Sequence, residues 1–363
     1  MSSEREAVKA EFLIANGLGD AARFALAGDA STRAYERLHT DTGRTLIFMD
    51  QPPHAETEPC RPDFTAEQRH ASGYNALARL AAGRIEAFVT TATYLKSLGL
   101  SAPEVIAFDA ANGLAVLEDL GDALYANLIG NGAGEAELYD AAIDVLAVLH
   151  AASPPAELTC GAVRWPLLAY DELALKTAGD IFIEWLPQLK TQLRFGPDAA
   201  AQWEEIWAPI RRQGDTEADV FCHRDYHAEN LIWLPERDGP GRVGLLDFQD
   251  AVRAHKVWDF SMLLHDARRD VSAEREAASL EHYFALRPEI DRQDFMAAYS
   301  ALGTLNVARI LGIFSRLVVR DGKPRYAGFM PRLWGYLDRT LHAPGMEVVK
   351  GWFDEHVPAE ART

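Results

Sequence analysis

Short apolar runs separated by polar turns dominate the first third of the chain. Residues 23–38 and 45–49 have strand character and flank residues 40–44, where an Asp-Thr-Gly sequence favours a hairpin turn. Two further apolar runs, residues 105–108 and 114–117, flank a second turn with the sequence Asp-Ala-Ala-Asn-Gly. This pattern predicts strands, and with them a lobe that is rich in β-structure.

Helical periodicity lies between these two pairs of strands. Residues 51–63 are rich in Pro, Glu and His, which predicts a loop. Helices are predicted over residues 65–80 and 85–98, and Gly99 is placed to close the second of them. Residues 118–122, with the sequence Glu-Asp-Leu-Gly-Asp, follow the last strand and predict a link to a second lobe.

The remainder of the chain is mainly helical. Apolar positions recur at helix spacing from Tyr139 to His150, and residues 172–192 and most of 291–339 also predict helices. Strand character is confined to residues 220–222, 231–234 and 243–247. We therefore predict an α+β chain with a small β-rich lobe, residues 1–118, followed by a large helical lobe, residues 119–363.

The charge balance argues against two classes of partner. The 363-residue chain carries 54 acidic and 36 basic side chains, a formal net charge of −18. Nucleic acids and anionic membranes need a positive field, so neither is expected as a main partner. The acidity either attracts a cationic substrate or simply keeps the protein in solution, and the oligomeric state is not predicted.

Cysteine usage and the N-terminus place the protein in the cytoplasm. Cys60, Cys160 and Cys222 form no CxxC pair, so neither a disulfide scaffold nor a zinc site is predicted. The first residues, Met-Ser-Ser-Glu-Arg-Glu-Ala, lack the apolar core of a signal peptide. No apolar run is predicted to reach the roughly 20 residues of a membrane span.

The strongest chemical signal is a His-x-Asp-x4-Asn pattern. It comprises His223, Asp225 and Asn230 on a loop between short apolar runs, and Asp247 follows at the end of the next apolar strand. Phosphoryl transfer needs a carboxylate that accepts the proton of the attacking hydroxyl, together with an amide and a second carboxylate that hold Mg²⁺. We therefore predict Asp225 as the catalytic base and Asn230 and Asp247 as metal ligands.

Two alternatives concern this pattern. The polar residues could merely cap turns, but the flanking strands and the spacing of Asp247 favour the catalytic interpretation. His223 is expected to brace the loop through hydrogen bonds instead of taking part in chemistry. Cys222 and His223 are neighbours on a strand and point to opposite faces, which argues against a Cys–His nucleophile.

These residues resemble the aminoglycoside phosphotransferase and choline kinase superfamily over most of the chain. The resemblance includes Leu149-His150 at the end of a long helix and Trp258-Asp259, whose Asp usually steadies the catalytic loop in that family. It implies a protein-kinase-like two-lobed fold that uses ATP and Mg²⁺. The first lobe would bind the nucleotide, and the second would carry the catalytic and substrate-binding residues.

Other segments resemble a narrower family of bacterial anomeric sugar kinases of cell-wall recycling. That family phosphorylates the C1 hydroxyl of N-acetylmuramate and N-acetylglucosamine with ATP, and a nucleotidyltransferase converts the α-1-phosphate to a UDP-sugar. The matching segments lie at residues 28–35, 48–53, 60–62, 247–251, 311–316 and 323–326. The resemblance implies the same reaction here.

The resemblance also suggests which residues contact the nucleotide. Small residues and backbone amides around Asp29, Ser31, Thr32 and Arg33 are expected to cover the phosphates, as a Gly-rich loop does. By analogy with kinase linkers, the backbone at Glu118 and Leu120 is expected to meet adenine.

One departure from the kinase pattern affects the phosphates. Met49 stands near the position of the usual strand Lys, and residues 88–92 offer no Glu to pair with such a Lys. Losing both partners is coherent, because a lone buried charge is costly. Arg33 is the candidate to replace that Lys.

The sugar is expected between the catalytic loop and the C-terminal helices, within reach of Asp225. Its hydroxyls and a lactyl carboxylate call for polar and cationic partners. The candidates are His227, Glu229, Asp250, Asn306, Arg309 and Arg325.

Three functions are compatible with the sequence. The first is the anomeric amino-sugar kinase, and the second is a kinase of the same fold that acts on an aminoglycoside, choline or another sugar. The third is a nucleotide-binding pseudokinase, which the intact Asp225, Asn230 and Asp247 disfavour. A cationic substrate would require an acidic pocket, so the surroundings of Arg309 and Arg325 discriminate between the first two.

Overall fold

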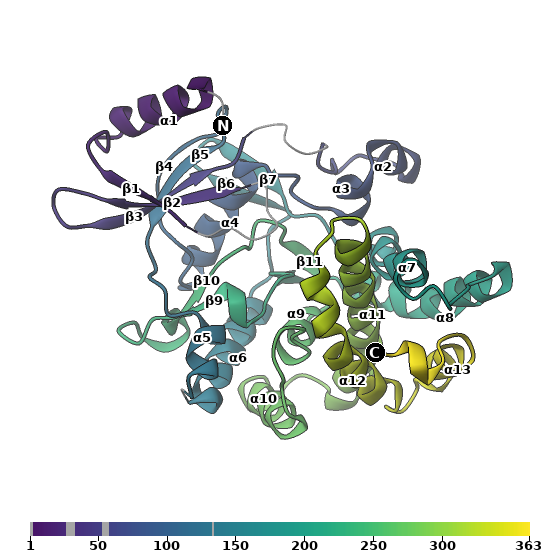
Figure 1. The fold of residues 1–363 in the computed structure, drawn as a ribbon. Coiled ribbons are helices and arrows are strands. Elements are labelled where there is room, and N and C mark those ends of the chain that lie inside the picture. The colour runs from purple at the N-terminus through teal and green to yellow at the C-terminus, as the bar shows by residue number, and fades with distance from the viewer. Residues whose placement is uncertain (1–2, 27–32, 53–57, 133) are drawn as a thin grey trace. The chain divides into compact units, whose positions relative to one another are not determined.

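The computed structural model describes residues 3–26, 33–52, 58–132 and 134–363. The chain forms two compact units (Figure 1). The first unit comprises Met1–Ala133, Pro155–Leu167 and Glu229–Ala251, and the second comprises Gly134–Pro154, Leu168–Ala228 and Val252–Thr363. The predicted boundary at residues 118–119 separates a nucleotide-binding lobe from a catalytic and substrate-binding lobe. The contacts that define the two units do not test such a functional division, so this boundary stays a prediction.

A five-stranded antiparallel sheet forms the centre of the first unit. Its order is β1 (Ala22–Ala25), β2 (Ala34–His39), β3 (Thr45–Asp50), β5 (Leu114–Glu118) and β4 (Val105–Asp109). The predicted turn joins β2 to β3: the backbone of Thr40 bonds that of Arg44 at 3.0 Å, and Gly43 supplies a positive φ of 79°. The single strand predicted over residues 23–38 is instead two strands, β1 and β2.

Helix α1 (Ser3–Ala15) covers one face of this sheet. Alternation along β3 directs Leu46 and Phe48 to this face, where they pack with Leu13 of α1 and with Leu114 and Val116 of β5. Met49 therefore lies on the opposite face, in register with Ala115 of β5. The two faces of β3 thus have different neighbours.

Three short helices and a hairpin follow the first strands. The helix predicted over residues 65–80 is interrupted at Gly73 (φ 90°), which gives α2 (Ala66–Ser72) and α3 (Tyr74–Ala78). The next helix, α4 (Ile85–Ser97), ends before Gly99 as predicted. It packs against a hairpin that the sequence did not predict, β6 (Glu157–Cys160) with β7 (Val163–Pro166).

The first unit is completed by α5 (Tyr125–Gly130) and a predicted hairpin. In this hairpin β9 (Leu231–Trp233) pairs with β10 (Val243–Leu245), and the short η2 (Gly239–Arg242) precedes β10. Ile232 and Leu234 pack against Leu120, and Gly244 forms a bridge to Ser101. These contacts fix the hairpin to residues before β4 and after β5.

The second unit is helical, as predicted. Two short strands, β8 (Val220–Cys222) and β11 (Val252–Ala254), pair with each other, and only β8 was predicted. The helices are α6 (Glu135–Ala151), α7 (Glu172–Leu189), α8 (Pro197–Thr216), α9 (Val257–Leu264), α10 (Ala273–Leu286), α11 (Arg292–Val319), α12 (Met330–Leu341) and α13 (Glu347–His356), with the short η3 (Pro324–Phe329) and η4 (Ala359–Ala361).

Helix α11 is the central helix of the second unit. It packs along α7, α9 and α12, and Gly312 lets it approach α7 closely. A Cβ at Gly312 would lie 2.5 Å from the backbone carbon of Ile181, so any larger residue would push the helices apart. By length and composition α11 could cross a membrane, which the sequence analysis did not predict, yet 72% of its apolar window is buried inside the protein. These contacts make it a core helix.

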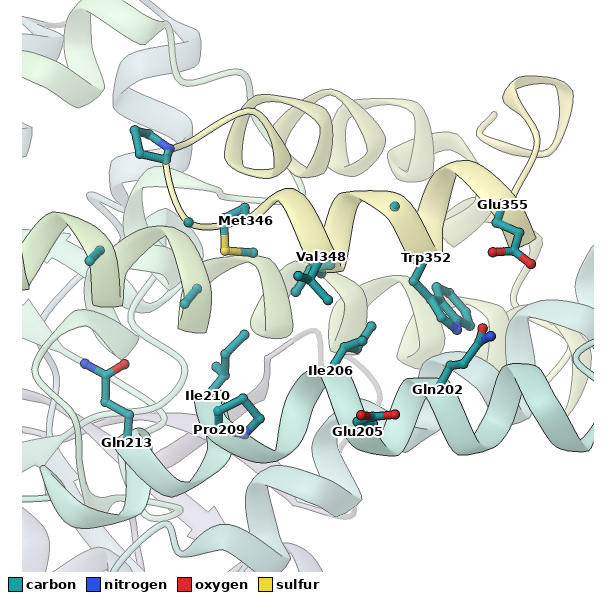
Figure 2. Close-up of a pocket in the computed structure, with 16 residues that line it drawn as sticks. Gln202, Glu205, Ile206, Pro209, Ile210, Gln213, Met346, Val348, Trp352 and Glu355 are labelled. Carbon is teal, nitrogen blue, oxygen red and sulfur yellow. The ribbon is translucent and has the colours of Figure 1, made fainter.

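A groove of about 810 Å³ lies in the second unit between α8 and α13 (Figure 2). Ile206 and Ile210 of α8 face Val348 and Trp352 of α13 across it. Among the residues that the structure describes, none of those predicted to act in catalysis, in metal binding or on a ligand lines this groove. The candidate site therefore has to be built from the predicted residues themselves.

Candidate active site

The loop that follows β8 is held by one buried carboxylate. Asp259 of α9 is 1% exposed, and its two oxygens accept the backbone N–H groups of His223 (2.7 Å) and Arg224 (2.8 Å). Arg224 has a φ of 82°, an unfavourable left-handed conformation for a residue with a side chain. The two charge-assisted hydrogen bonds stabilise that conformation directly before Asp225. The role that the family resemblance implied for Asp259 is thus seen in its contacts.

Burial is the main influence on the pKa of Asp259. It raises this pKa above the ordinary value, while His223 and the two backbone N–H groups act in the opposite direction. The Sγ of Cys222 lies 3.2 Å from Oδ1 of Asp259. Burial and this carboxylate raise the pKa of Cys222 well above its usual value, so the thiol is a poor nucleophile. This agrees with the prediction against a Cys–His nucleophile.

The rest of the loop is fastened on both sides of Asp225. The hydroxyl of Tyr226 donates to the carbonyl of Ala142 in α6 (2.8 Å), and the N–H of Ala228 donates to Asp266 (3.3 Å). Throughout residues 220–228, all of which are described, Asp225 is the one residue that is not buried. Residues 220–228 therefore present one accessible carboxylate on a segment fastened on both sides, as a positioned base requires.

His223 is fully buried in this loop. Its ring packs edge-on against Tyr226 with the centroids 5.5 Å apart, and its backbone N–H is one of the donors to Asp259. The residue therefore contributes to the loop through packing and its main chain. The predicted side-chain hydrogen bonds stay a prediction.

Asn230 and Asp247 lie at the same end of the β9–β10 hairpin. Asn230 closes the short turn η1 (Ala228–Asn230) before β9, and Asp247 follows β10. The N–H of Leu246 donates to the carbonyl of Asn230 at 3.0 Å, so the residues next to the two predicted ligands are hydrogen-bonded. Asp247 has a φ of 61°, a second left-handed residue within the predicted site. The hairpin thus brings these two residues together.

Arg33, the candidate phosphate ligand, contacts Asp247. Its Nη2 lies 2.7 Å from Oδ1 of Asp247, and its Nη1 donates to Oε1 of Gln249 at 2.7 Å. The Arg33 side chain is 10% exposed and that of Asp247 is 41% exposed. Burial alone would lower the pKa of Arg33, but Tyr35, Asp247 and Asp250 raise it above its usual value. The guanidinium therefore stays charged beside the predicted metal ligand.

The predicted absence of a kinase-type Lys is consistent with the face of β3. Met49 is fully buried, and it lies on the face away from α1. A Lys–Glu pair does exist in this unit: Lys9 lies 2.8 Å from Glu36 of β2. Glu36 is in register with Phe48, so the pair belongs to the α1 face and cannot replace the missing one.

Two of the predicted nucleotide residues fall in the described part of the linker. The N–H of Glu118 donates to the carbonyl of Glu104 (2.8 Å), and its carboxylate pairs with Arg237 (2.5 Å). Leu120 packs with Ile232 and Leu234. An adenine contact at Glu118 would therefore use a group other than its N–H. Asp29, Ser31 and Thr32 lie outside the described residues.

The predicted sugar-binding residues fall into several environments. His227 is buried, with Nε2 at 3.4 Å from Arg268, whereas Glu229 and Arg325 are exposed. Asp250 accepts the N–H of Ala81 at 2.6 Å and so holds the turn before α4. Asp250 therefore stabilises a turn within the first unit.

Asn306 and Arg309 lie one turn apart on α11, and they contact each other. The Nε of Arg309 donates to Oδ1 of Asn306 at 2.9 Å, and the Arg309 guanidinium lies over the ring of Trp258 at 5.7 Å. Trp258 directly precedes Asp259, so these two predicted residues belong to the surroundings of the catalytic loop.

The sequence analysis missed three residues that shape this site. The Nε2 of Gln249 donates to Oδ1 of Asp247 at 3.0 Å, the same oxygen that Arg33 contacts. Tyr226 and Asp266 hold the loop that carries Asp225. Gln249 had a signal, because it stands within the Asp-Phe-Gln-Asp segment that was already singled out. The other two act through tertiary contacts that local sequence patterns do not encode.

A β-rich unit and a mainly helical unit, together with a matching phosphotransferase family and similar named kinases, identify a kinase-like phosphotransferase that acts on an alcohol group. The chain belongs to the phosphotransferase enzyme family, whose model matches residues 25–294. It is 64% identical over 362 residues to an N-acetylmuramate/N-acetylglucosamine kinase of Caulobacter vibrioides, covering 100% of this chain and 99% of that protein.

Two solved structures share the fold at low sequence identity. An ethanolamine kinase of Plasmodium vivax is 11% identical, with a TM-score of 0.57 over 92% of this chain and 85% of that chain. The ADP-bound aminoglycoside phosphotransferase APH(2'')-Ib is 13% identical, with a TM-score of 0.53 over 94% and 99% of the two chains. The predicted α+β kinase-like fold is confirmed by these likenesses.

Proposed function

We propose that this protein uses ATP and Mg²⁺ to phosphorylate the C1 hydroxyl of N-acetylmuramate and N-acetylglucosamine. The observation that carries the proposal is the 64% identity to a kinase named for these two sugars, over almost the full length of both chains. The product would be the sugar α-1-phosphate. Its consumer would be a nucleotidyltransferase in cytoplasmic peptidoglycan recycling.

Asp225 would be the base of this reaction. Its carboxylate accepts the proton of the C1 hydroxyl as the oxygen attacks the terminal phosphorus, and the bond to the ADP leaving group breaks. Support comes from residues 220–228, in which Asp225 alone is accessible between buried neighbours. A carboxylate held in this way needs little reorganisation in the transition state.

Asn230 and Asp247 would hold the magnesium ion. An amide oxygen and a carboxylate are ligands of the kind that Mg²⁺ prefers, with the phosphates and water completing its shell. The described residues contain no group of three or more His, Cys, Asp or Glu side chains that could bind a metal, and this arrangement does not need one. When bound, the ion neutralises charge that develops on the phosphate oxygens.

The triphosphate would be gripped by Arg33 and by the segment before it. Arg33 is buried, charged and next to Asp247, so a short rearrangement transfers its donors from the carboxylate to a phosphate. The small residues Asp29, Ser31 and Thr32 would cover the phosphates, and the backbone at Glu118 and Leu120 would meet adenine. Apart from Leu120, these nucleotide contacts would lie within residues 1–118.

The acceptor sugar would be bound by the second part of the chain, residues 119–363. The proposed contacts are polar side chains near the catalytic loop and on the C-terminal helices. They are His227, Glu229, Asp250, Asn306, Arg309 and Arg325.

A direct assay tests this proposal. The protein is incubated with Mg-ATP and either sugar, and the product is examined for a phosphate that is stable to alkali and labile to acid, as an anomeric phosphate is. Asp225→Asn serves as the matched inactive control. Turnover of both sugars to such a product supports the proposal. Transfer only to choline, an aminoglycoside or another hydroxyl would replace it with a different acceptor, and nucleotide binding without any transfer would indicate a pseudokinase.

A further inference from the structure

Arg309 is a buried cation whose partners in the described structure are neutral. It is 9% exposed, in a protein with a net charge of −18. Its contacts within the described residues are Asn306 Oδ1 at 2.9 Å, the Sδ of Met262 at 3.5 Å and the ring of Trp258. A buried charge without an opposite charge is costly, so its retention points to an anion supplied from outside.

A continuous stack connects Arg309 with the catalytic loop. The guanidinium of Arg224 lies 4.6 Å from the ring centre of Tyr170, and the rings of Tyr170 and Trp258 are 4.8 Å apart. Trp258 is in turn 5.7 Å from the guanidinium of Arg309. Arg224 immediately precedes Asp225. The stack therefore links the unneutralised cation to the residue directly before the proposed base.

Asn306 fixes the orientation of the Arg309 guanidinium without neutralising its charge. It is fully buried, and its amide nitrogen donates to Ser261 Oγ at 3.1 Å and to Met262 Sδ at 3.2 Å. The orientation of the amide is therefore set by α9, and its oxygen is directed to Nε of Arg309. With Nε held in this way, the guanidinium keeps N–H groups for a carboxylate, which it can bind in a bidentate manner.

We propose that Arg309 binds the carboxylate of the lactyl ether in N-acetylmuramate, with Asn306 as its positioning residue. The inference rests on the proposed function and adds the feature that distinguishes its two substrates. N-acetylglucosamine has the same ring and the same C1 hydroxyl but carries no carboxylate. Arg309 then contributes to the binding of one sugar and hardly affects the other.

Two variants test the inference with the pair of sugars as an internal control. Arg309→Met removes the charge and keeps an apolar chain over Trp258. It should raise KM for N-acetylmuramate roughly 10- to 100-fold, the loss expected for a charged hydrogen-bonded contact, and change KM for N-acetylglucosamine much less. Asn306→Asp keeps the shape but gives Arg309 an internal counter-ion, so it should also weaken N-acetylmuramate selectively.

The matched control is Arg292→Met. Arg292 begins the same helix but is exposed and paired with Glu281 at 2.8 Å. This variant should behave like wild type with both sugars. An equal loss with both sugars in Arg309→Met would overturn the inference in favour of a structural role. A raised KM for ATP with either sugar would overturn it in favour of a phosphate contact.

Equilibrium binding without ATP separates this inference from the proposed reaction. Wild-type protein should bind N-acetylmuramate more tightly than its neutral primary amide, and Arg309→Met should bind the two equally. That result supports the carboxylate site even if no sugar is phosphorylated. Equal affinity of the wild type for acid and amide overturns it even if both sugars are phosphorylated.

Discussion

The guanidinium of Arg33 lies 2.7 Å from the carboxylate of Asp247, the residue proposed to hold magnesium. The same oxygen accepts the side-chain amide of Gln249 at 3.0 Å. If Asp247 holds the metal as proposed, Arg33 and the metal would compete for this carboxylate oxygen. A bound triphosphate would resolve this competition, because it would offer Arg33 a new anion and arrive together with the metal.

Replacement of Arg33 should separate nucleotide binding from metal binding. Arg33→Met removes the phosphate contact and releases Asp247, so KM for ATP should rise about 10-fold or more. Affinity for Mg²⁺ alone should increase, because the carboxylate no longer has a competing cation. Titration calorimetry and steady-state kinetics measure the two effects. The exposed Arg44, in the turn between β2 and β3, supplies the control variant Arg44→Met. A fall in both affinities would contradict the competition.

Substitutions of Asp225 and of Asp247 should impair phosphoryl transfer in different ways. Asp225→Asn should lower kcat by about 10²- to 10⁴-fold, the usual contribution of general-base catalysis, with ATP binding largely kept. Asp247→Ala should also abolish the effect of Mg²⁺ on nucleotide binding, because a ligand of the ion is gone. Nucleotide affinity measured with and without Mg²⁺ distinguishes the two. Near-normal turnover in Asp225→Asn would show that the base is another group.

The arrangement of this site was easier to predict from the sequence than the contacts that support it. That Asn230 and Asp247 lie at one end of a hairpin could be predicted, because the spacing of the two short strands is local, whereas the roles of Asp225, Asn230 and Asp247 stay predictions. The contact of Arg33 with Asp247 could not be predicted, since it joins residues far apart in the chain. Asp250 shows the same limit: it was chosen because it lies close to the predicted catalytic groups in the sequence, and its contact with the backbone of Ala81 could not be predicted.

The secondary structure shows a similar division. Strands with clear turns, such as β8, β9 and β10, were predicted from alternation and length. The β6–β7 hairpin was missed because its residues carry little apolar periodicity and are stabilised by packing on α4. The break at Gly73 was missed for a different reason. A glycine inside a helical pattern is often tolerated, and only its φ of 90° shows that it ends α2.

Asp259 should be intolerant of even an isosteric change. In Asp259→Asn one of two accepting oxygens becomes an amide nitrogen, so a donor faces the backbone N–H of His223 or Arg224. Losing a charged contact of this kind costs about 2 kcal/mol. The variant also removes a buried negative charge, which offsets part of this loss of stability. The value of kcat is therefore a more sensitive measure of the change than the free energy of unfolding. The loop that carries Asp225 is less well held, and kcat should fall more than ATP affinity. Wild-type kcat in this variant would contradict the role of Asp259.

Acidification should destabilise the second unit through His150. Burial, with the nearby charges of Arg287, Lys256 and His255, lowers the pKa of His150 from 6.5 to about 3. Its Nδ1 lies 2.9 Å from the hydroxyl of Tyr283 on α10. Because the folded pKa is below the unfolded one, protons bind the unfolded chain preferentially. The contribution of His150 to the free energy of unfolding is therefore fully present above about pH 6.5 and is lost progressively as the pH falls from there towards 3.

The contribution of His150 at pH 5 can be isolated by substitution. At pH 5 the solution is about 1.5 units below the pKa of His150 in the unfolded chain. This difference corresponds to a loss of about 2 kcal/mol in the free energy of unfolding. His150→Gln keeps a polar partner for Tyr283 but takes up no proton, so its unfolding free energy should fall about 2 kcal/mol less than that of wild type between pH 7.5 and 5. A remaining slope is expected from His255, whose pKa is also lowered, chiefly by burial. Urea unfolding at both pH values measures this, with His342→Gln at an exposed position as control. Parallel losses in wild type and His150→Gln would show that other groups cause the acid sensitivity.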